Sequence, residues 1–484
     1  MTEKGRRIVI VGAGFSGALL AVHLLRRSQP EDRVFLIERN AAFGRGLAYA
    51  TGNAHHLLNV RAGNMSAFSD QPDHFLEWVR GLPEADLGTV QVTVDRLTFV
   101  SRRLYGSYIQ HILARELSSE DCGSRLCLVA DEAVALHRAD GHYRVEVGCG
   151  QHYEADAVAL AVGNFPPEGD TPGYVANPWD PAALAALGPE APVLLIGTGL
   201  TMIDVVISLL DQKHSGPIHA ISRRGLLPRT HAAVTPEPRF LPATAAPQRV
   251  LALLILIRQQ IRRAATEGRD WRSVMDALRP DARDLWRGLP LAEKQRFLRH
   301  LRPWWDVHRH RMAPSVAARI QAARARGQLT VSRARLGRLT PQRGGIDAEL
   351  LPVGVAAPVV SKVDRVINCS GPLSDISRIQ TPLIRTLLSD GSARPDPLDL
   401  GLDVTGESAV IDSAGRISDR LFAVGPITKG VFWESTAVPD IRLQCESLAA
   451  HILATARRAP GTAKRRIAAR HTEIPRWTEF SRTY

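Results

Sequence analysis

The sequence predicts an α/β fold with two Rossmann-like parallel sheets and a helical insertion. Two observations support this class. The unit strand, glycine turn, helix, strand occurs twice, at residues 8–38 and 193–221. Residues 246–326, in contrast, are rich in arginine and carry few strand signals. Alternating strands and helices favour parallel sheets covered by helices, and 484 residues suffice for two or three hydrophobic cores.

The first unit carries a complete dinucleotide-binding pattern. An apolar strand at residues 8–11 is followed by Gly12, Gly14 and Gly17, and then by a helix-like run. In this pattern the first glycine permits a tight turn, the second lets a pyrophosphate approach the backbone, and the third lets the helix pack closely. Glu38 follows about 20 residues later, where an acid accepts hydrogen bonds from a ribose. The unit therefore predicts a dinucleotide site.

The second unit has a weaker turn signal. Gly197 and Gly199 follow an apolar strand, but Met202 replaces the third glycine. We still expect a second dinucleotide site, with looser packing of the helix on the strand. Two such sites in one chain suggest electron transfer between their ligands. The alternative interpretation is an ordinary turn between a strand and a helix.

Residues at the end of the second unit indicate its nucleotide. Ser222, Arg223 and Arg224 stand where an NAD site places an acid. A guanidinium binds a 2′-phosphate through two parallel hydrogen bonds, so the sequence favours NADPH. If these arginines are only solvated surface residues, NADH remains possible.

Composition limits the class of protein. Hydrophobic residues make up 45% and charged residues 23%, as in soluble globular proteins, and no run reaches the roughly 18 apolar residues of a membrane span. We therefore expect a cytoplasmic protein. The net charge of +12 suits anionic cofactors and substrates. The basic runs have no interleaved aromatic residues, which argues against nucleic-acid binding. Five scattered cysteines predict neither a disulfide framework nor a metal site. The oligomeric state stays open.

The order of elements suggests the domain organisation. A helix-like run at 105–117, short β-like runs at 125–155 and a buried strand ending at Gly163 follow the first unit. This order is that of a glutathione-reductase-type FAD domain. We expect the first part of that domain at 1–189, an NAD(P) domain at 190–365 containing the helical insertion at about 246–326, the second part of the FAD domain at 366–455, and a basic tail at 456–484.

Four stretches resemble one known family. They are the first glycine turn, residues 44–49 with 57–60, residues 305–311, and residues 425–439. In these the chain resembles FAD/NAD(P)-binding flavoproteins related to the class B monooxygenases, and the resemblance covers nearly the whole chain. The family includes an FAD-dependent urate hydroxylase and amine N-hydroxylating enzymes. The chain departs from it at Met202 and at Pro426, where many related flavoproteins place an acid.

The resemblance implies an NAD(P)H-dependent FAD monooxygenase with oxygen as co-substrate. Such an enzyme hydroxylates a small polar substrate, urate- or purine-like or an amine, through a flavin C4a-hydroperoxide. No catalytic side chain is nominated because the cofactor supplies the chemistry. Two other classes stay open. One is an NAD(P)H oxidoreductase that passes electrons to another acceptor without inserting oxygen. The other is a flavin-binding protein that is RNA-associated or sensory.

The cofactor-binding residues follow from the two units and the resemblance. Asn59 could hydrogen-bond the flavin or cap a turn, and Gly425 should let the backbone approach the flavin beside a helix beginning near 438. The FAD residues are Gly12, Gly14, Phe15, Ser16, Gly17, Glu38, Arg39, Arg45, Leu58, Asn59, Gly163 and Gly425. The NADPH residues are Gly197, Gly199, Thr201, Ser222, Arg223 and Arg224.

The helical insertion offers a candidate substrate surface. Trp304, His308 and Arg311 could share one helix face at this spacing. An aromatic ring beside cationic donors suits a planar anion such as urate. The alternative is a helix that packs its tryptophans and solvates its arginines.

Overall fold

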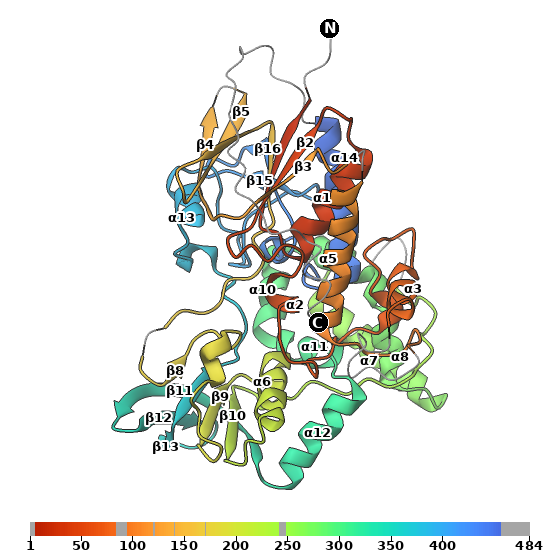
Figure 1. The fold of residues 1–484 in the computed structure, drawn as a ribbon. Coiled ribbons are helices and arrows are strands. Elements are labelled where there is room, and N and C mark those ends of the chain that lie inside the picture. Colours follow the sequence, from red (N-terminus) through yellow and green to blue (C-terminus); the bar gives the residue numbers. More distant parts are fainter. Residues whose placement is uncertain are drawn as a thin grey trace.

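Two largely parallel sheets organise the chain (Figure 1). The computed structural model describes residues 5–83, 94–119, 122–139, 141–169, 171–241 and 248–455. The predicted tail at 456–484 lies outside the described residues. The predicted α/β class, with two Rossmann-like sheets and a helical insertion, is confirmed. The domain bounds given above stay predictions.

The first sheet is built from both ends of the described chain. Its order is β15-β16-β7-β1-β2-β3, with β1 parallel to β2 and β7, and β7 parallel to β16. The apolar runs of β1 and β7 are fully buried because helices α1, α5 and α14 pack on this sheet around one core. The elements are β1 Arg7–Val11, β2 Arg33–Ile37, β3 Leu126–Val129, β7 Ala157–Leu160, β15 Ala409–Ile411, β16 Ile417–Ala423, α1 Phe15–Arg27, α5 Arg102–Ser118 and α14 Val438–Thr455.

A small antiparallel sheet covers another side of the first sheet. Strands β4, β5 and β6 pair in sequence order and share a second core with helix α13 and strands of the first sheet. Alternating buried residues in β5 produce this one-sided packing. The elements are β4 Ala133–Ala139, β5 His142–Val147, β6 His152–Ala155 and α13 Pro382–Ser389.

The second sheet has seven strands. Its order is β13-β12-β11-β10-β9-β14-β8, with β11, β10, β9, β14 and β8 parallel and an antiparallel β11–β12–β13 extension. Helices α6 and α12 cover its core. The elements are β8 Tyr174–Val175, β9 Val193–Ile196, β10 Ile218–Ser222, β11 Leu329–Gln342, β12 Gly345–Pro352, β13 Val359–Val363, β14 Arg365–Asn368, α6 Leu200–Asp211 and α12 Pro314–Ala325.

The insertion forms a group of helices with its own core. Trp286 of this group stacks on Trp433 with ring centroids 4.6 Å apart, and Leu400 joins the same cluster. The insertion therefore packs against the segment that leads into α14. Its helices are α7 Val250–Thr266, α8 Trp271–Ala277, α9 Ala282–Gly288, α10 Leu291–His300 and α11 Arg302–Arg309.

Two further short helices belong to the N-terminal half. They are α2 Gly46–Tyr49 and α3 His74–Arg80. Within the part of the chain that the structure describes, none of the helices combines the length and apolar character needed to cross a bilayer.

Candidate functional site

The first glycine turn joins β1 to α1. Gly12 has φ +98°, and its N–H donates to the Ile37 carbonyl at 2.8 Å. A Cβ at Gly12 would lie 2.4 Å from the Ala161 oxygen, and one at Gly17 would lie 1.8 Å from the Gly12 oxygen. Both positions therefore exclude side chains, as expected where a helix begins tightly on a strand.

The start of α1 is open to an anion. Gly14 precedes the helix and provides no side-chain cap, so the first N–H groups keep their hydrogen-bonding capacity. The loop at residues 44–46 packs on this turn. The Gly44 N–H donates to the Ala13 carbonyl at 2.7 Å, and a Cβ at Gly46 would lie 2.9 Å from Gly14 Cα. The turn and the loop therefore form a backbone surface without side chains, which fits a pyrophosphate.

Three predicted binding residues make contacts within the protein. Glu38 Oε2 accepts the Ala13 N–H at 2.9 Å, so the acid at the end of β2 also holds the glycine turn. Arg39 is exposed, and its guanidinium lies 3.8 Å from the Glu132 carboxylate. Arg45 donates to the Gln110 side chain on α5 at 2.9 Å.

Phe15 is part of the hydrophobic core. Its ring lies 6.2 Å from that of Tyr49 and 5.9 Å from that of Tyr105, between ring centroids. Its side chain therefore packs inside the protein. Only its backbone N–H, in the first turn of α1, could contact a phosphate. The sequence pattern did not distinguish these two roles.

The end of β16 meets the start of α1. Gly425 has φ +80°, and a Cβ there would lie 2.5 Å from Ser16 Oγ. Gly163, at φ +71°, follows the neighbouring strand β7. The structure thus brings these two glycines and Ser16 to the edge of the sheet that carries the first glycine turn.

Residues 58–59 contact the backbone near helix α5 and the segment that follows β10. Leu58 is buried and its N–H donates to the Val100 carbonyl at 2.8 Å. The Asn59 carbonyl accepts from His231 Nε2 at 3.0 Å. Burial, together with nearby Arg311, lowers the pKa of His231 to about 3. His231 is therefore neutral at pH 7, with its proton on the nitrogen that faces Asn59.

The second glycine turn repeats the geometry of the first. Gly197 has φ +106°, and its N–H donates to the Ile221 carbonyl at 2.7 Å. Gly199 precedes α6 without a side-chain cap, and Thr201 lies in the first turn of that helix. Met202, at the position that matches Gly17 of the first unit, is fully buried in the core of the second sheet.

The end of β10 presents arginines around a structured loop. Ser222 Oγ accepts the Gly225 N–H at 2.9 Å and lies 2.9 Å from Thr198 Oγ1, so this hydroxyl shapes the loop. Arg223 and Arg224 are exposed. Arg333, which is also exposed, lies opposite Ser222 in the backbone pairing of β10 with β11. Sequence reasoning missed Arg333 because this strand pairing joins segments far apart in the chain.

Residues 309–311 do not form the predicted helix face. Helix α11 ends at Arg309, so Arg311 lies outside the helix that carries Trp304 and His308. The Trp304 side chain is exposed, whereas Arg311 is buried and pairs with Asp276. The predicted face of Trp304, His308 and Arg311 is therefore wrong, because it assumed that the helix continued past Arg309.

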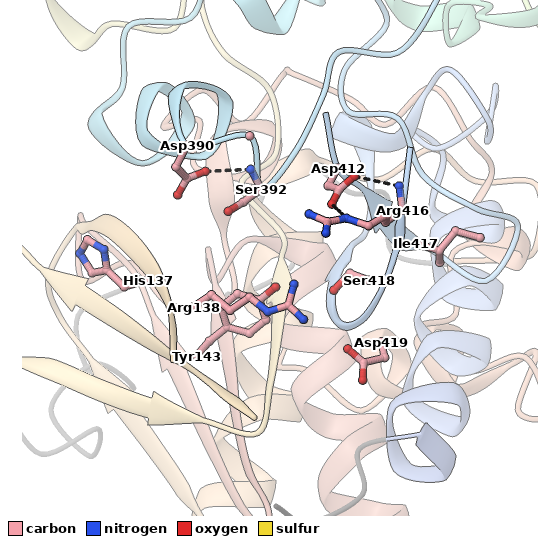
Figure 2. Close-up of a pocket in the computed structure, with 11 residues that line it drawn as sticks. His137, Arg138, Tyr143, Asp390, Ser392, Asp412, Arg416, Ile417, Ser418 and Asp419 are labelled. Carbon is pink, nitrogen blue, oxygen red and sulfur yellow. Dashed lines mark hydrogen bonds and ion pairs between the residues drawn. The ribbon is translucent and has the colours of Figure 1, made fainter. Parts of the chain in front are cut away.

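A separate cavity of about 480 Å³ opens where the small antiparallel sheet meets the turn after α13 (Figure 2). It is lined by residues of β4 and β5, the turn after α13, and the β15–β16 hairpin. In the wall of this cavity, the Asp412 carboxylate accepts a hydrogen bond from Nε of Arg416 at 2.7 Å. None of the predicted cofactor-binding residues lines this cavity.

Comparison with known families supports the assignment of the first unit. Residues 9–165 match the model of an FAD-NAD(P)-binding family. The chain therefore contains an FAD-NAD(P)-binding domain. This segment holds the first glycine turn, Glu38 and Gly163, which agrees with the cofactor class predicted for the first unit. A search of curated proteins gives no match.

Solved structures with this fold cover nearly the whole chain. Ornithine hydroxylase from Pseudomonas aeruginosa is 15% identical, with a TM-score of 0.60 over 94% of this chain and 100% of that one. Cadaverine monooxygenase from Erwinia amylovora, solved with FAD, is 13% identical, with a TM-score of 0.59 over 98% and 100%. Bacillithiol disulfide reductase from Bacillus cereus is 13% identical, with a TM-score of 0.52 over 93% and 99%. At these identities the likeness shows the fold, and the predicted resemblance to class B flavoproteins is confirmed at that level.

Proposed function

We propose that this protein is an NADPH-dependent FAD monooxygenase that acts on a small amine. The observation that carries the proposal is the pair of open glycine turns, one on each parallel sheet, whose units are joined by the hydrogen bond from His231 to Asn59. Bound FAD would supply electron transfer and oxygen activation. The fold shared with ornithine hydroxylase and cadaverine monooxygenase supports an amine as the substrate.

The residues of this chain would bind and orient the two cofactors. The turn at Gly12–Gly17 and the N-terminus of α1 would hold the FAD pyrophosphate, with Glu38 beside the ribose. The turn at Gly197–Gly199 would hold the NADPH pyrophosphate. Arg223 and Arg224, joined by Arg333, would bind the 2′-phosphate, because all three are exposed and Arg333 pairs with Ser222 at the end of β10.

A second candidate is an NAD(P)H oxidoreductase that passes electrons to another acceptor. The same fold occurs in bacillithiol disulfide reductase, so the two-site arrangement alone does not require oxygen insertion. This candidate predicts NADPH oxidation that continues without oxygen when an artificial acceptor is present. The monooxygenase predicts oxygen consumption that depends on the substrate.

The test is a coupled assay on the purified, FAD-loaded protein. NADPH oxidation and oxygen uptake are followed together across amino acids, diamines and purines including urate. We expect an amine to stimulate both rates and to yield one hydroxylated product per oxygen consumed. Stimulation by urate alone would reassign the substrate class. Oxygen-independent turnover with an artificial acceptor, and no hydroxylated product, would favour the second candidate.

A further inference from the structure

Three parallel strands of the first sheet are followed by glycines at one edge. Strand β7 runs parallel to β1 and to β16, so the carboxyl ends of the three strands lie side by side. The glycines after them have positive φ, at Gly12 (+98°), Gly163 (+71°) and Gly425 (+80°). Ligands of open α/β sheets bind outside this edge. The backbone position of Gly425 therefore shapes the surface that FAD would meet.

A buried amide on α14 holds the turn at Gly425. Gln444 is 4% exposed, and its Oε1 accepts the Gly425 N–H at 3.0 Å. Nε2 of the same amide donates to Thr428 Oγ1 at 3.0 Å and to Ser408 Oγ at 3.1 Å. A glutamine amide has two N–H donors and one acceptor oxygen, so these three bonds use both donors and the oxygen. The side chain of Gln444 is therefore fixed in one orientation.

Thr428 extends this hydrogen bonding to the other polar group of Gly425. Thr428 is fully buried, and its Oγ1 donates to the Gly425 carbonyl at 2.7 Å. The hydroxyl proton is used in this bond, so the Thr428 oxygen is free to accept from Gln444 Nε2. Gln444 thus holds the Gly425 N–H directly and the Gly425 carbonyl through Thr428.

The third partner of Gln444 has an unusual backbone. Ser408, just before β15, has φ +68°, which residues other than glycine seldom adopt. It is 2% exposed, and its carbonyl accepts the Ala423 N–H of β16 at 2.9 Å. A strained conformation persists only where surrounding contacts hold it, and such residues cluster at functional sites. The bond from Gln444 to the Ser408 hydroxyl is one of these contacts.

The next residue along α14 contacts the start of α1. Cys445 is fully buried, and its Sγ donates to the Ser16 carbonyl at 3.4 Å. Ser16 is also the residue on which the Gly425 turn packs, since a Cβ at Gly425 would lie 2.5 Å from Ser16 Oγ. One turn of α14 therefore holds both elements that meet at this edge of the sheet.

We infer that Gln444 is a positioning residue for FAD, because its amide holds the Gly425 turn against the start of α1. This inference rests on the proposed function, which places FAD at this edge of the first sheet. Pro426 offers neither a carboxylate nor a backbone N–H, so the turn depends on the position of its backbone. Gln444 acts on the cofactor through Gly425.

The affinity for FAD tests the inference without turnover. The loaded, full-length protein is diluted without NADPH or substrate, and the fluorescence of released flavin gives the Kd. Q444M keeps a side chain of similar length but removes the acceptor for the Gly425 N–H, so the turn must move or leave that donor unpaired. We expect its Kd for FAD to rise about tenfold or more. We also expect a changed visible circular dichroism of the flavin that stays bound, which a residue with a merely structural role would not cause.

A matched pair at Thr428 tests the same hydrogen bonds from the other end. T428V removes the hydroxyl and should raise the Kd for FAD about 3- to 10-fold, whereas T428S keeps the hydroxyl and should bind FAD as the parent protein does. In the double variant of Q444M with T428V the two effects should not add, because both act on one turn. The control is S273A on α8, which removes a buried hydroxyl that donates to the Asp270 carbonyl at 2.7 Å and should leave the affinity for FAD unchanged.

Three outcomes would overturn the assignment. The first is a folded Q444M protein with the FAD affinity and flavin spectrum of the parent. The second is equal FAD affinity in T428V and T428S, which also decides the matter if Q444M does not fold. The third is a loss of FAD from S273A as large as that from Q444M. Each leaves the proposed function standing, whereas an absence of oxygen insertion would refute that function and leave these affinities intact.

Discussion

Gly14 lies where helix α1 and the loop at residues 44–46 come closest. A Cβ at Gly14 would lie 3.3 Å from Gly46 Cα, and larger side chains would also fill the approach of a pyrophosphate. We expect Gly14→Val to fold but to purify with less than about a tenth of the FAD of the parent protein. Absorbance of the purified protein, and of flavin released by denaturation, measures this. Gly52→Val is the control because nothing lies within 4 Å of its Cβ. A fully yellow Gly14→Val protein would contradict the placement of FAD.

Arg223 tests the nucleotide preference of the second site. It is exposed beside Arg224 and near Arg333. Removing a charge-assisted phosphate contact should raise the Michaelis constant for NADPH about 10- to 100-fold in Arg223→Ala, with little effect on that for NADH. Steady-state kinetics with both nucleotides measure the difference, and Arg258→Ala, exposed on α7, serves as the control. Equal effects on both nucleotides would remove the 2′-phosphate role.

Individual roles could be predicted from sequence only where they depend on local backbone geometry. Gly12 and Gly197 have positive φ and no space for a side chain, as the glycine spacing predicts. Phe15 shares the same local pattern, but its side chain packs against Tyr105, and that contact depends on how α5 folds back. Arg333 joins the arginines of the second site through a strand pairing that no local pattern encodes.

At the scale of elements, α5 and α6 are joined by a buried ion pair. Arg102 and Asp204 lie 2.9 Å apart, with side chains 14% and 8% exposed. Removing one partner leaves the other charge buried, so Asp204→Asn or Arg102→Met should each lower the free energy of unfolding by about 3–5 kcal/mol. The double variant should recover part of this loss. Urea denaturation measures the free energy of unfolding of each variant. The control is His55→Ala, which removes a half-exposed pair with Asp211 and should change that free energy by about 1 kcal/mol or less. Additive losses in the double variant would show that the two residues are not coupled.

His231, in the segment after β10, predicts that the stability of the fold depends on pH. The pKa of His231 falls from its ordinary 6.5 to about 3 on folding. Between these values the unfolded chain binds a proton that the folded chain does not. The neutral His231 therefore makes its full contribution to the free energy of unfolding above pH 6.5. Below that pH the contribution falls by about 1.4 kcal/mol per pH unit.

His231→Gln isolates this contribution, because glutamine can still donate to the Asn59 carbonyl. The variant should lose about 2 kcal/mol less stability than the parent protein between pH 7 and pH 5. Urea denaturation at several pH values measures the two slopes. Identical slopes would show that His231 is not held neutral by the fold.

Elements were predictable where periodicity is strong and uncertain at their ends. The helices over α1, α6 and α14 follow directly from their apolar patterns, whereas α11 ends at Arg309, earlier than helical spacing suggested. The residues beyond it instead run beside the segment after β10. Arg309 at the end of α11 lies 3.3 Å from the Glu434 carboxylate, and no pattern within either segment indicates this contact.

At the scale of the whole molecule, the two sheets could be predicted but the meeting of their parts could not. The repeated glycine turns predict two nucleotide units, and the structure has one such turn on each sheet. The order of elements already predicted that the chain returns to the domain of the first unit at 366–455, and β16 lies in the first sheet. The stacking of Trp286 on Trp433, in contrast, depends on contacts between distant segments. This stacking places the inserted helices beside the segment that leads into α14.

The central claim is that one chain holds FAD on the first sheet and takes electrons from NADPH on the second. An anaerobic titration of the purified yellow protein with NADPH tests it most directly, with flavin absorbance as the readout. We predict complete bleaching of the flavin at one NADPH per FAD, and slower bleaching by NADH. A protein that binds no flavin, or whose flavin keeps its colour in excess NADPH, would contradict the account.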